Sequence, residues 1–406
     1  MKVLDRFLRY VRYDTTSDPH APETKYPSTD KQLTLLSLLR DELREMGLSA
    51  DMNAYGYVTA TLPANVEGAP TLCYIAHVDT SPAVSGTDVR PRVIRYEGGD
   101  ILLDEAGEYR ITEADNPELS GYRGQELVVT DGRTLLGADD KAGVAEIMAA
   151  VEYFVTHPDE PHGTVKVAFT PDEEIGRGTD HFDVAAFGAD FGYTVDGGEL
   201  GEIEYENFNA ASGLLEIDGV SVHPGSAKGR MKNAVEIFAA FQSALPKDQT
   251  PATTEKYEGF YMPDEVKGSV EHLVAYYIIR DHDKAAFEAK KAYFSELAER
   301  IDRAWGGGCV KATVKDSYYN MAEIIRQHMH LIDHAKAAMR SCGVTPRVVP
   351  IRGGTDGARL SYEGLPCPNL STGGLNFHGR REFIPVRSLS TMTRVLIALT
   401  ESYARP

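Results

Sequence analysis

The chain opens with two stretches in which apolar residues recur at helical spacing. This pattern predicts an amphipathic helix over residues 3–11 and a second helix over residues 32–46. A polar run before Pro19 ends the first helix. Thr29 and Gln32 have the spacing of a capping box at the start of the second helix, and Gly47 is expected to cap its C-terminal end.

Short and continuously apolar runs follow, and their pattern is typical of buried strands. Three such runs cover residues 71–76, 165–169 and 191–195, and a helical pattern over residues 142–154 separates the first two. Strands that alternate with helices predict an α/β fold. We therefore expect a mixed, largely parallel sheet that is flanked by helices on both faces.

The pattern changes after about residue 207. The next hundred residues predict a strand, a helix, a second strand, a long charged helix over residues 283–305 and a third strand over residues 310–314. A block of this length is a plausible domain. We interpret residues 208–318 as an α+β domain inserted into a catalytic domain that comprises residues 1–207 and 319–406.

Charge and composition narrow the possible partners. The 42 Lys and Arg residues against 61 Asp and Glu residues give a net charge of −19, which argues against nucleic acid or an anionic membrane surface as a partner. A hydrophobic share of 42% with 25% charged residues excludes a disordered, collagen-like or disulfide-scaffold protein. The four cysteines form no CxxC pair, and the sequence contains neither a signal peptide core nor a transmembrane run, so we expect a cytoplasmic protein with reduced thiols.

Histidine and carboxylate side chains follow each of the three buried runs. His77 and Asp79 come after the first run, Glu173 and Glu174 after the second, and Asp196 directly after the third. Sites in open α/β sheets form beyond the carboxyl ends of the strands, so these side chains are expected to converge. Each group alone also has an ordinary structural explanation, such as a hydrogen-bonded histidine or a solvated acidic surface.

The convergence of these groups favours a metal site. Asp139, where a glycine loop enters a helix, adds a further carboxylate, although the Asp139–Asp140 pair could serve as a helix N-cap. So many carboxylates in one place repel one another unless cations hold them. Histidine and carboxylate ligands without cysteine suit Zn²⁺, Mn²⁺ or Co²⁺. The sequence contains no HExxH, G-x-S-x-G or Walker A motif, and the glycine-rich residues 352–357 are expected to form an active-site loop.

Six segments that span the chain in order resemble the co-catalytic zinc peptidases. That family includes tripeptide aminopeptidases, glutamate carboxypeptidase and acyl-amino-acid deacylases. The amino-acid sequences of the six segments are most similar to those of the tripeptide aminopeptidases. The segments are residues 75–80, 136–143, 170–176, 195–198, 351–357 and 372–379.

The resemblance implies a site with two zinc ions, for which Co²⁺ or Mn²⁺ could substitute. Asp139 would bridge the two ions, His77 and Asp196 would complete one, and Glu174 and His378 would complete the other.

The same resemblance implies two catalytic residues that do not bind metal. Asp79 would orient the imidazole of His77, and Glu173 would be the general base and acid acting on a water that bridges the ions. Two adjacent glutamates fit this division, because a carboxylate can transfer a proton only while it stays off the metal.

The inserted block resembles the lid and dimerisation domain of the family, which implies a homodimer. His223 would stabilise the oxyanion in a neighbouring subunit's site, and Arg280 would bind the carboxylate of the substrate. A turn histidine and an exposed ion pair are the ordinary alternatives for these two residues. Asn320 and Arg352 are further candidates for substrate binding.

These observations predict a metallo-aminopeptidase that removes the N-terminal residue from short peptides, tripeptides in particular. A dipeptidase, a carboxypeptidase or an N-acyl-amino-acid deacylase on the same site is the nearest alternative. A non-catalytic peptide-binding scaffold is a remote alternative, because the sequence keeps every expected ligand as well as Asp79 and Glu173.

Overall fold

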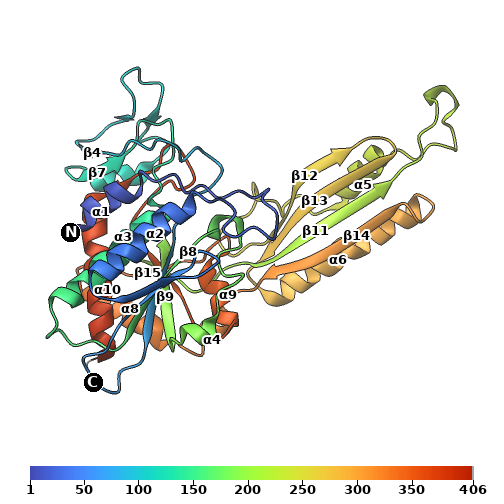
Figure 1. The fold of residues 1–406 in the computed structure, drawn as a ribbon. Coiled ribbons are helices and arrows are strands. Elements are labelled where there is room, and N and C mark those ends of the chain that lie inside the picture. Colours follow the sequence, from blue (N-terminus) through green and yellow to red (C-terminus); the bar gives the residue numbers. More distant parts are fainter. Residues whose placement is uncertain (405–406) are drawn as a thin grey trace. The chain divides into compact units, whose positions relative to one another are not determined.

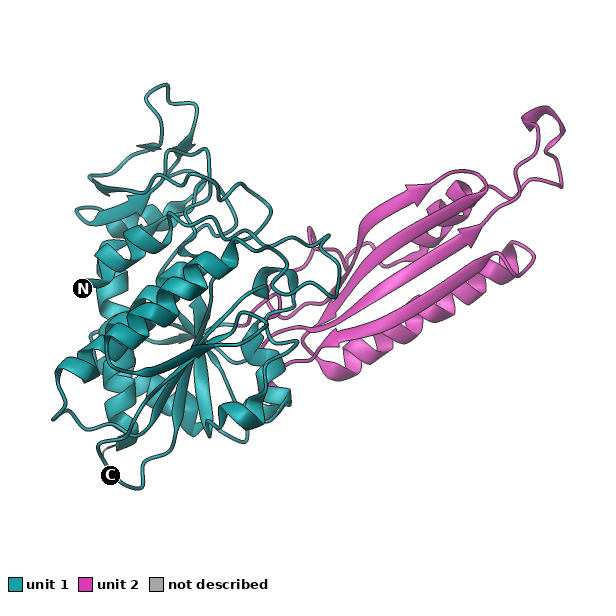
Figure 2. Ribbon diagram, viewed as in Figure 1, with its two compact units in different colours: residues 1–205, 323–349, 355–406 teal, residues 206–322, 350–354 magenta. Residues whose placement is uncertain are grey.

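A computed structural model describes residues 1–404, which fold into two compact units (Figures 1 and 2). Unit 1 comprises residues 1–205, 323–349 and 355–404, and unit 2 comprises residues 206–322 and 350–354. The chain therefore leaves unit 1, builds unit 2 and returns.

Unit 1 is built on an eight-stranded mixed sheet with the order β1-β2-β8-β3-β9-β16-β10-β15. The central neighbours β8, β3, β9 and β16 run parallel, so their carboxyl ends lie at one edge of the sheet. The predicted α/β class with a mixed sheet is confirmed. The bounds are β1 (Ser49–Met52), β2 (Val58–Leu62), β3 (Leu72–His77), β8 (Val165–Thr170), β9 (Phe191–Gly197), β10 (Glu202–Glu204), β15 (Arg347–Val348) and β16 (Asn369–Ser371).

Helices cover both faces of this sheet (Figure 1). Strand β3 presents apolar side chains to both sides and is therefore buried along its whole length. On one face Tyr74 donates from its hydroxyl to the carbonyl oxygen of Leu396 in α10. On the other face Cys73 and Ile75 belong to an apolar cluster with Phe187 at the end of α4. The helices of unit 1 are α1 (Val3–Tyr10), α2 (Gln32–Glu45), α3 (Ala138–Thr156), α4 (Val184–Phe187), α7 (Ala322–Ile325), which begins at the last residue of unit 2, α8 (His330–Ser341), α9 (Asp356–Tyr362) and α10 (Val386–Ala404).

The start of α2 differs from the capping box that the sequence predicts. Thr29 donates its hydroxyl hydrogen to the carbonyl oxygen of Thr16, and neither Thr29 nor Lys31 caps the helix with its side chain. The side-chain amide of Gln32 donates to the carboxylate of Asp172 and to Oγ1 of Thr29. The polar residues here therefore connect α2 to another loop rather than satisfy its own first turn.

The segment between residues 92 and 129 forms small sheets that the sequence pattern did not reveal. Strands β4 (Arg92–Arg95) and β7 (Glu126–Val129) pair with β17 (Ile384–Pro385), while β5 (Ile101–Leu102) pairs with β6 (Arg110–Ile111). Exposed arginines dominate β4, so its sequence shows no apolar run.

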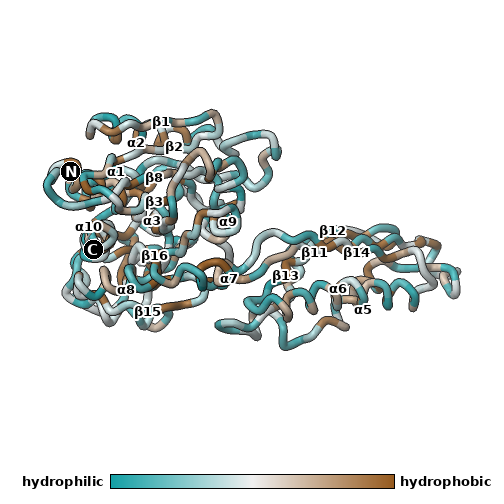
Figure 3. The backbone as a smooth tube through the Cα atoms, turned by 90° about the horizontal axis from the view of Figure 1, so that it is seen from below, coloured by the Kyte–Doolittle hydropathy of each residue, from teal (hydrophilic) through white to brown (hydrophobic). Residues whose placement is uncertain are grey.

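Unit 2 is a four-stranded antiparallel sheet with the order β12-β13-β11-β14, and two helices pack on one face. Figure 3 shows hydrophilic and hydrophobic residues alternating along α6, as expected for a helix with one face against a sheet. Strand β12 is an additional strand that the sequence pattern did not predict, and its pairing with β13 shifts register next to Pro263. The bounds are β11 (Asn209–Asp218), α5 (Ala234–Ala244), β12 (Phe260–Gly268), β13 (His272–Asp281), α6 (Lys284–Ala304) and β14 (Val310–Tyr318).

Residues 350–354 pack with unit 2, although the sequence pattern placed them in the catalytic domain. The guanidinium of Arg352 explains this, because it donates to the carbonyl oxygens of Lys256 and Glu258. All four cysteines are free thiols, and none of the helices within residues 1–404 is long and apolar enough to cross a membrane.

Candidate metal centre

The parallel strands bring the candidate site residues to one edge of the sheet of unit 1. His77 is the last residue of β3 and lies opposite Thr170, the last residue of β8. Asp196 lies near the end of β9, the other neighbour of β3. The loop after β8 carries Glu173 and Glu174 to the same edge, so the topology explains the convergence.

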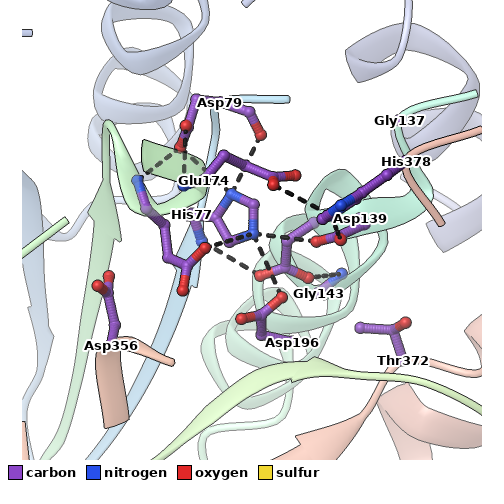
Figure 4. A network of polar contacts seen from close by, with 12 residues as sticks. His77, Asp79, Gly137, Asp139, Gly143, Glu174, Asp196, Asp356, Thr372 and His378 are labelled. Carbon is purple, nitrogen blue, oxygen red and sulfur yellow. Dashed lines mark hydrogen bonds and ion pairs between the residues drawn. The ribbon is translucent and has the colours of Figure 1, made fainter. Parts of the chain in front are cut away.

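His77, Asp139 and Asp196 form the first group of potential metal ligands (Figure 4). Nε2 of His77 lies 3.0 Å from Oδ1 of Asp139 and 3.2 Å from Oδ1 of Asp196. Asp139 stands at the start of α3, where its backbone departs from helical geometry before the regular helix begins. One imidazole nitrogen and two carboxylate oxygens therefore face a common point.

Asp139, Glu174 and His378 form the second group, and Asp139 contributes its other oxygen to it. Nε2 of His378 lies 2.8 Å from Oδ2 of Asp139 and 3.0 Å from Oε2 of Glu174. The second oxygen of Glu174, Oε1, is buried and has no hydrogen-bond partner among residues 1–404. A buried carboxylate oxygen without a partner, in a set of nitrogen and oxygen donors, fits a divalent cation.

The pKa values of the side chains in the two ligand groups indicate that a bound cation would replace protons. Burial raises the pKa of Asp196 to about 7, and burial with the nearby Asp139 charge raises the pKa of Glu174 to about 7. Hydrogen bonds to Asp139 and Glu174 raise the pKa of His378 to about 11. Without metal, protons stabilise these crowded side chains, and metal binding must displace those protons.

Asp79 holds two parts of the site together. Nδ1 of His77 lies 3.1 Å from the carbonyl oxygen of Asp79 and 3.3 Å from its Oδ1. Since both neighbours only accept hydrogen bonds, the ring proton belongs on Nδ1, which leaves the lone pair of Nε2 free for a metal. The Asp79 carboxylate also accepts the backbone N–H groups of Glu173 and Glu174, a second contact that no sequence pattern indicated.

Glu173 borders the ligand groups but belongs to neither of them. Its Oε2 lies 4.0 Å from Nε2 of His77. Burial and the charge of Asp196 raise the pKa of Glu173 well above its usual value. The structure therefore contains a carboxyl group with a raised proton affinity beside His77 of the first ligand group.

Comparison with known proteins now identifies the family. The profile of peptidase family M20/M25/M40 matches residues 125–402. Peptidase T of Caldanaerobacter subterraneus subsp. tengcongensis is 52% identical over 407 residues, which cover 100% of this chain and 99% of that protein. Peptidase T of Parabacteroides distasonis is 51% identical over 409 residues and all of both chains. The chain belongs to peptidase family M20/M25/M40.

Solved structures agree with the fold of this M20/M25/M40 peptidase. The crystal structure of aminopeptidase PepT from Bacillus cereus has a TM-score of 0.78 at 24% identity and covers 99% of this chain and 98% of that chain. A tripeptidase from Staphylococcus aureus has a TM-score of 0.78 at 21% identity and covers 100% and 98% of the two chains. The resemblance drawn from the sequence segments is thereby confirmed for the family and the fold.

Glu382 is a buried residue of the site that sequence reasoning missed. Its carboxylate accepts the backbone N–H groups of Leu136, Gly137 and Asp139 at 2.6, 2.8 and 3.1 Å. It thus connects the loop that carries Asp139 to the segment that carries His378, four residues earlier. The only sequence signal was an acidic residue shortly after a candidate ligand.

Replacing Glu382 with Gln is expected to weaken metal binding by about 10–100-fold, because an amide cannot accept all three N–H groups equally well. A competition assay with a chromophoric zinc chelator measures this affinity. Glu105→Gln, at an exposed position, is the matched control. Unchanged zinc affinity in Glu382→Gln would show that the Asp139 loop holds its position without Glu382.

Asp172 fixes the other end of the loop that carries the two glutamates. Its carboxylate accepts the backbone N–H and the hydroxyl of Ser28 as well as the side-chain amide of Gln32. The backbone of Asp172 adopts a positive φ of 61°, which is uncommon for a residue with a side chain. These bonds hold the turn that leads into Glu173.

The four candidates for substrate binding all belong to unit 2. Nδ1 of His223 accepts the backbone N–H of Gly225, and Arg280 donates to the carbonyl oxygens of Ala211 and Ile279. Asn320 is buried and its amide group donates to the carbonyl oxygen of His282.

The guanidinium of Arg352 donates to Thr254 and lies 5.0 Å from the ring centre of Phe208. The roles predicted for these four residues therefore stay predictions.

Proposed function

We propose that this peptidase is a metallo-aminopeptidase that removes the N-terminal residue from short peptides, with tripeptides as its main substrates and two Zn²⁺ ions per chain. The observation that carries the proposal is Asp139, whose two oxygens face two separate histidine–carboxylate groups while Glu173 stays outside both. The relatives named Peptidase T and the neighbour described as a tripeptidase support the choice of substrate.

The ligand groups and Glu173 divide the chemistry of peptide hydrolysis between them. His77 and Asp196 would hold one ion, Glu174 and His378 the other, and Asp139 both. A bound metal pair supplies Lewis-acid polarisation of the scissile carbonyl and lowers the pKa of water.

Glu173 moves the proton. Its carboxylate takes a proton from the attacking water as the new C–O bond forms. It then gives this proton to the nitrogen of the leaving amine as the C–N bond breaks. Asp79 supports metal binding and proton transfer, because it orients His77 and accepts the backbone N–H of Glu173.

Unit 2 would bind the rest of the peptide. A guanidinium group matches a carboxylate with two hydrogen bonds, so Arg280 would bind the C-terminal carboxylate of the substrate, and Arg352 is a further residue for substrate binding. His223 would stabilise the oxyanion, and Asn320 would support the pocket. A homodimer formed through unit 2 and a cytoplasmic location complete the proposal.

A substrate series tests this function. The zinc-loaded protein is expected to release leucine from Leu-Gly-Gly with a higher kcat/KM than from Leu-Gly or from Leu-Gly-Gly-Gly. N-acetyl-leucine serves as the deacylase substrate, and mass spectrometry identifies the products. Faster turnover of N-acetyl-leucine, or release of the C-terminal glycine from Leu-Gly-Gly, would contradict the aminopeptidase assignment.

A further inference from the structure

A hollow of about 740 Å³ in unit 1 opens beside the second ligand group. It is continuous with Glu174 and His378, so a peptide bound at these residues has access to it. Two loop segments form much of its remaining wall, residues 16–20 and residues 81–83, together with Thr29 and Lys31. None of these residues has a role in the chemistry described above.

Shape alone selects weakly in a hollow of this size. Its volume lies within the range of sites that take whole drug-sized ligands, so any single amino-acid side chain fits with room to spare. The lining beyond the metal ligands combines the apolar residues Pro19, Pro82 and Ala83 with hydroxyl groups on Thr16, Ser17, Thr29 and Ser81. The charged and hydroxyl-bearing residues of the lining can therefore distinguish between side chains that shape alone would admit equally.

The charges of the lining leave one carboxylate uncompensated. Nζ of Lys31 lies 2.8 Å from Oδ1 of Asp14, so its charge is already paired. The charge of Glu174 belongs to the metal centre. Asp18 has no ion-pair partner within the described part of the chain, and its carboxylate accepts only the backbone N–H of His20 at 2.9 Å.

Asp18 is also held in place relative to the catalytic loop. Its backbone N–H donates to Oγ of Ser28 at 2.9 Å, and the same hydroxyl donates to the carboxylate of Asp172. Asp172 directly precedes Glu173 and Glu174. This chain of bonds connects the backbone of Asp18 to the loop that carries Glu173 and Glu174, and a specificity residue needs such support.

Ser17, the neighbour of Asp18, is a buried residue of the same lining. Its side chain is 3% exposed and lines the hollow. Its Oγ has no hydrogen-bond partner among residues 1–404. A buried hydroxyl without a partner is costly, and a polar group of a bound ligand would satisfy it.

We propose that this hollow receives the side chain of the substrate's N-terminal residue, and that Asp18 favours a side chain with an ammonium or guanidinium group over one with a carboxylate. The inference rests on the proposed aminopeptidase function, because the N-terminal residue must lie beside the metal centre for its peptide bond to be cleaved. Ser17 adds a hydrogen-bonding position for a polar side chain. Among short peptides, the hollow thus favours those with a basic N-terminal residue over those with an acidic one.

Charge variants at residue 18 test the proposal on the zinc-loaded, full-length protein. We compare kcat/KM for Lys-Gly-Gly, Glu-Gly-Gly and the neutral reference Leu-Gly-Gly. Asp18→Asn is expected to lower the ratio of Lys-Gly-Gly to Glu-Gly-Gly by about fivefold. Asp18→Lys is expected to lower it further, because repulsion replaces attraction.

Asp30→Lys is the matched control. Asp30 follows Asp18 by twelve residues in the sequence, and 83% of its side chain is exposed. It does not line the hollow. Asp30→Lys changes the net charge by the same amount as Asp18→Lys. Because residue 30 does not line the hollow, the ratio of Lys-Gly-Gly to Glu-Gly-Gly is expected to stay at the wild-type value.

Two results would overturn the proposal while the wild-type protein still cleaves tripeptides. One is a specificity ratio that does not respond to residue 18. The other is an equal loss for all three peptides, which would mean that Asp18 binds the common α-ammonium group instead of the side chain. Failure of the wild-type protein to cleave any of the three peptides would instead reject the proposed function itself.

Discussion

Glu173→Gln is expected to lower kcat for Leu-Gly-Gly by about 10²–10⁴-fold while zinc content stays near two ions per chain. The amide has nearly the same shape but cannot take a proton from water or return one to the leaving amine. Because Glu173 lies outside both ligand groups, its loss removes no metal ligand. Stopped-time product assays and metal analysis on the same sample measure both quantities.

The adjacent glutamate supplies the control for this prediction. Glu174→Gln removes a ligand of the second group and is expected to lower zinc content by about one ion per chain. If Glu173→Gln loses zinc and Glu174→Gln keeps it, the two roles are reversed. Near-normal turnover by Glu173→Gln would exclude Glu173 as the base.

Asp139→Asn is expected to have the largest effect on metal content. Asp139 is the only residue that occurs in both ligand groups, with Oδ1 near His77 and Oδ2 near His378. An amide has a neutral oxygen and a nitrogen in place of the two anionic oxygens, so the side chain can no longer bridge two ions and its negative charge is lost. We expect well below one zinc ion per chain after gel filtration, with loss of peptide hydrolysis.

Asp196→Asn is the matched comparison for Asp139→Asn. Asp196 belongs only to the first group, so this variant is expected to retain about one zinc ion per chain. Equal metal loss in the two variants would contradict the bridging role of Asp139. Circular dichroism of both proteins separates loss of metal from loss of the fold.

The sequence predicted the parts of the site that depend on strong local patterns. Continuous apolar runs marked β3, β8 and β9, and polar residues after such runs must lie at the carboxyl edge of a parallel sheet. His77, Glu174 and Asp196 could therefore be grouped from the order of residues along the chain. The pairing of Asp139 with His378 came from the resemblance to a family, because 239 residues separate them.

Other contacts could not be predicted because they join distant segments through single polar side chains. Glu382 accepts backbone groups near residue 137, and Asp172 bonds to Ser28 and Gln32. No periodicity marks such a pair. The capping box is not formed, since the Thr29 hydroxyl donates to Thr16 and the Gln32 amide donates to Asp172 and to the Thr29 hydroxyl.

Zinc titration of the metal-depleted protein is the decisive experiment for peptide hydrolysis by a two-ion centre. Hydrolysis of Leu-Gly-Gly is followed at each zinc equivalent, and the products are identified by mass spectrometry. We expect release of leucine and Gly-Gly, with activity rising until two zinc ions are bound per chain. Full activity with a single ion, or no hydrolysis with two ions bound, would contradict the proposed mechanism.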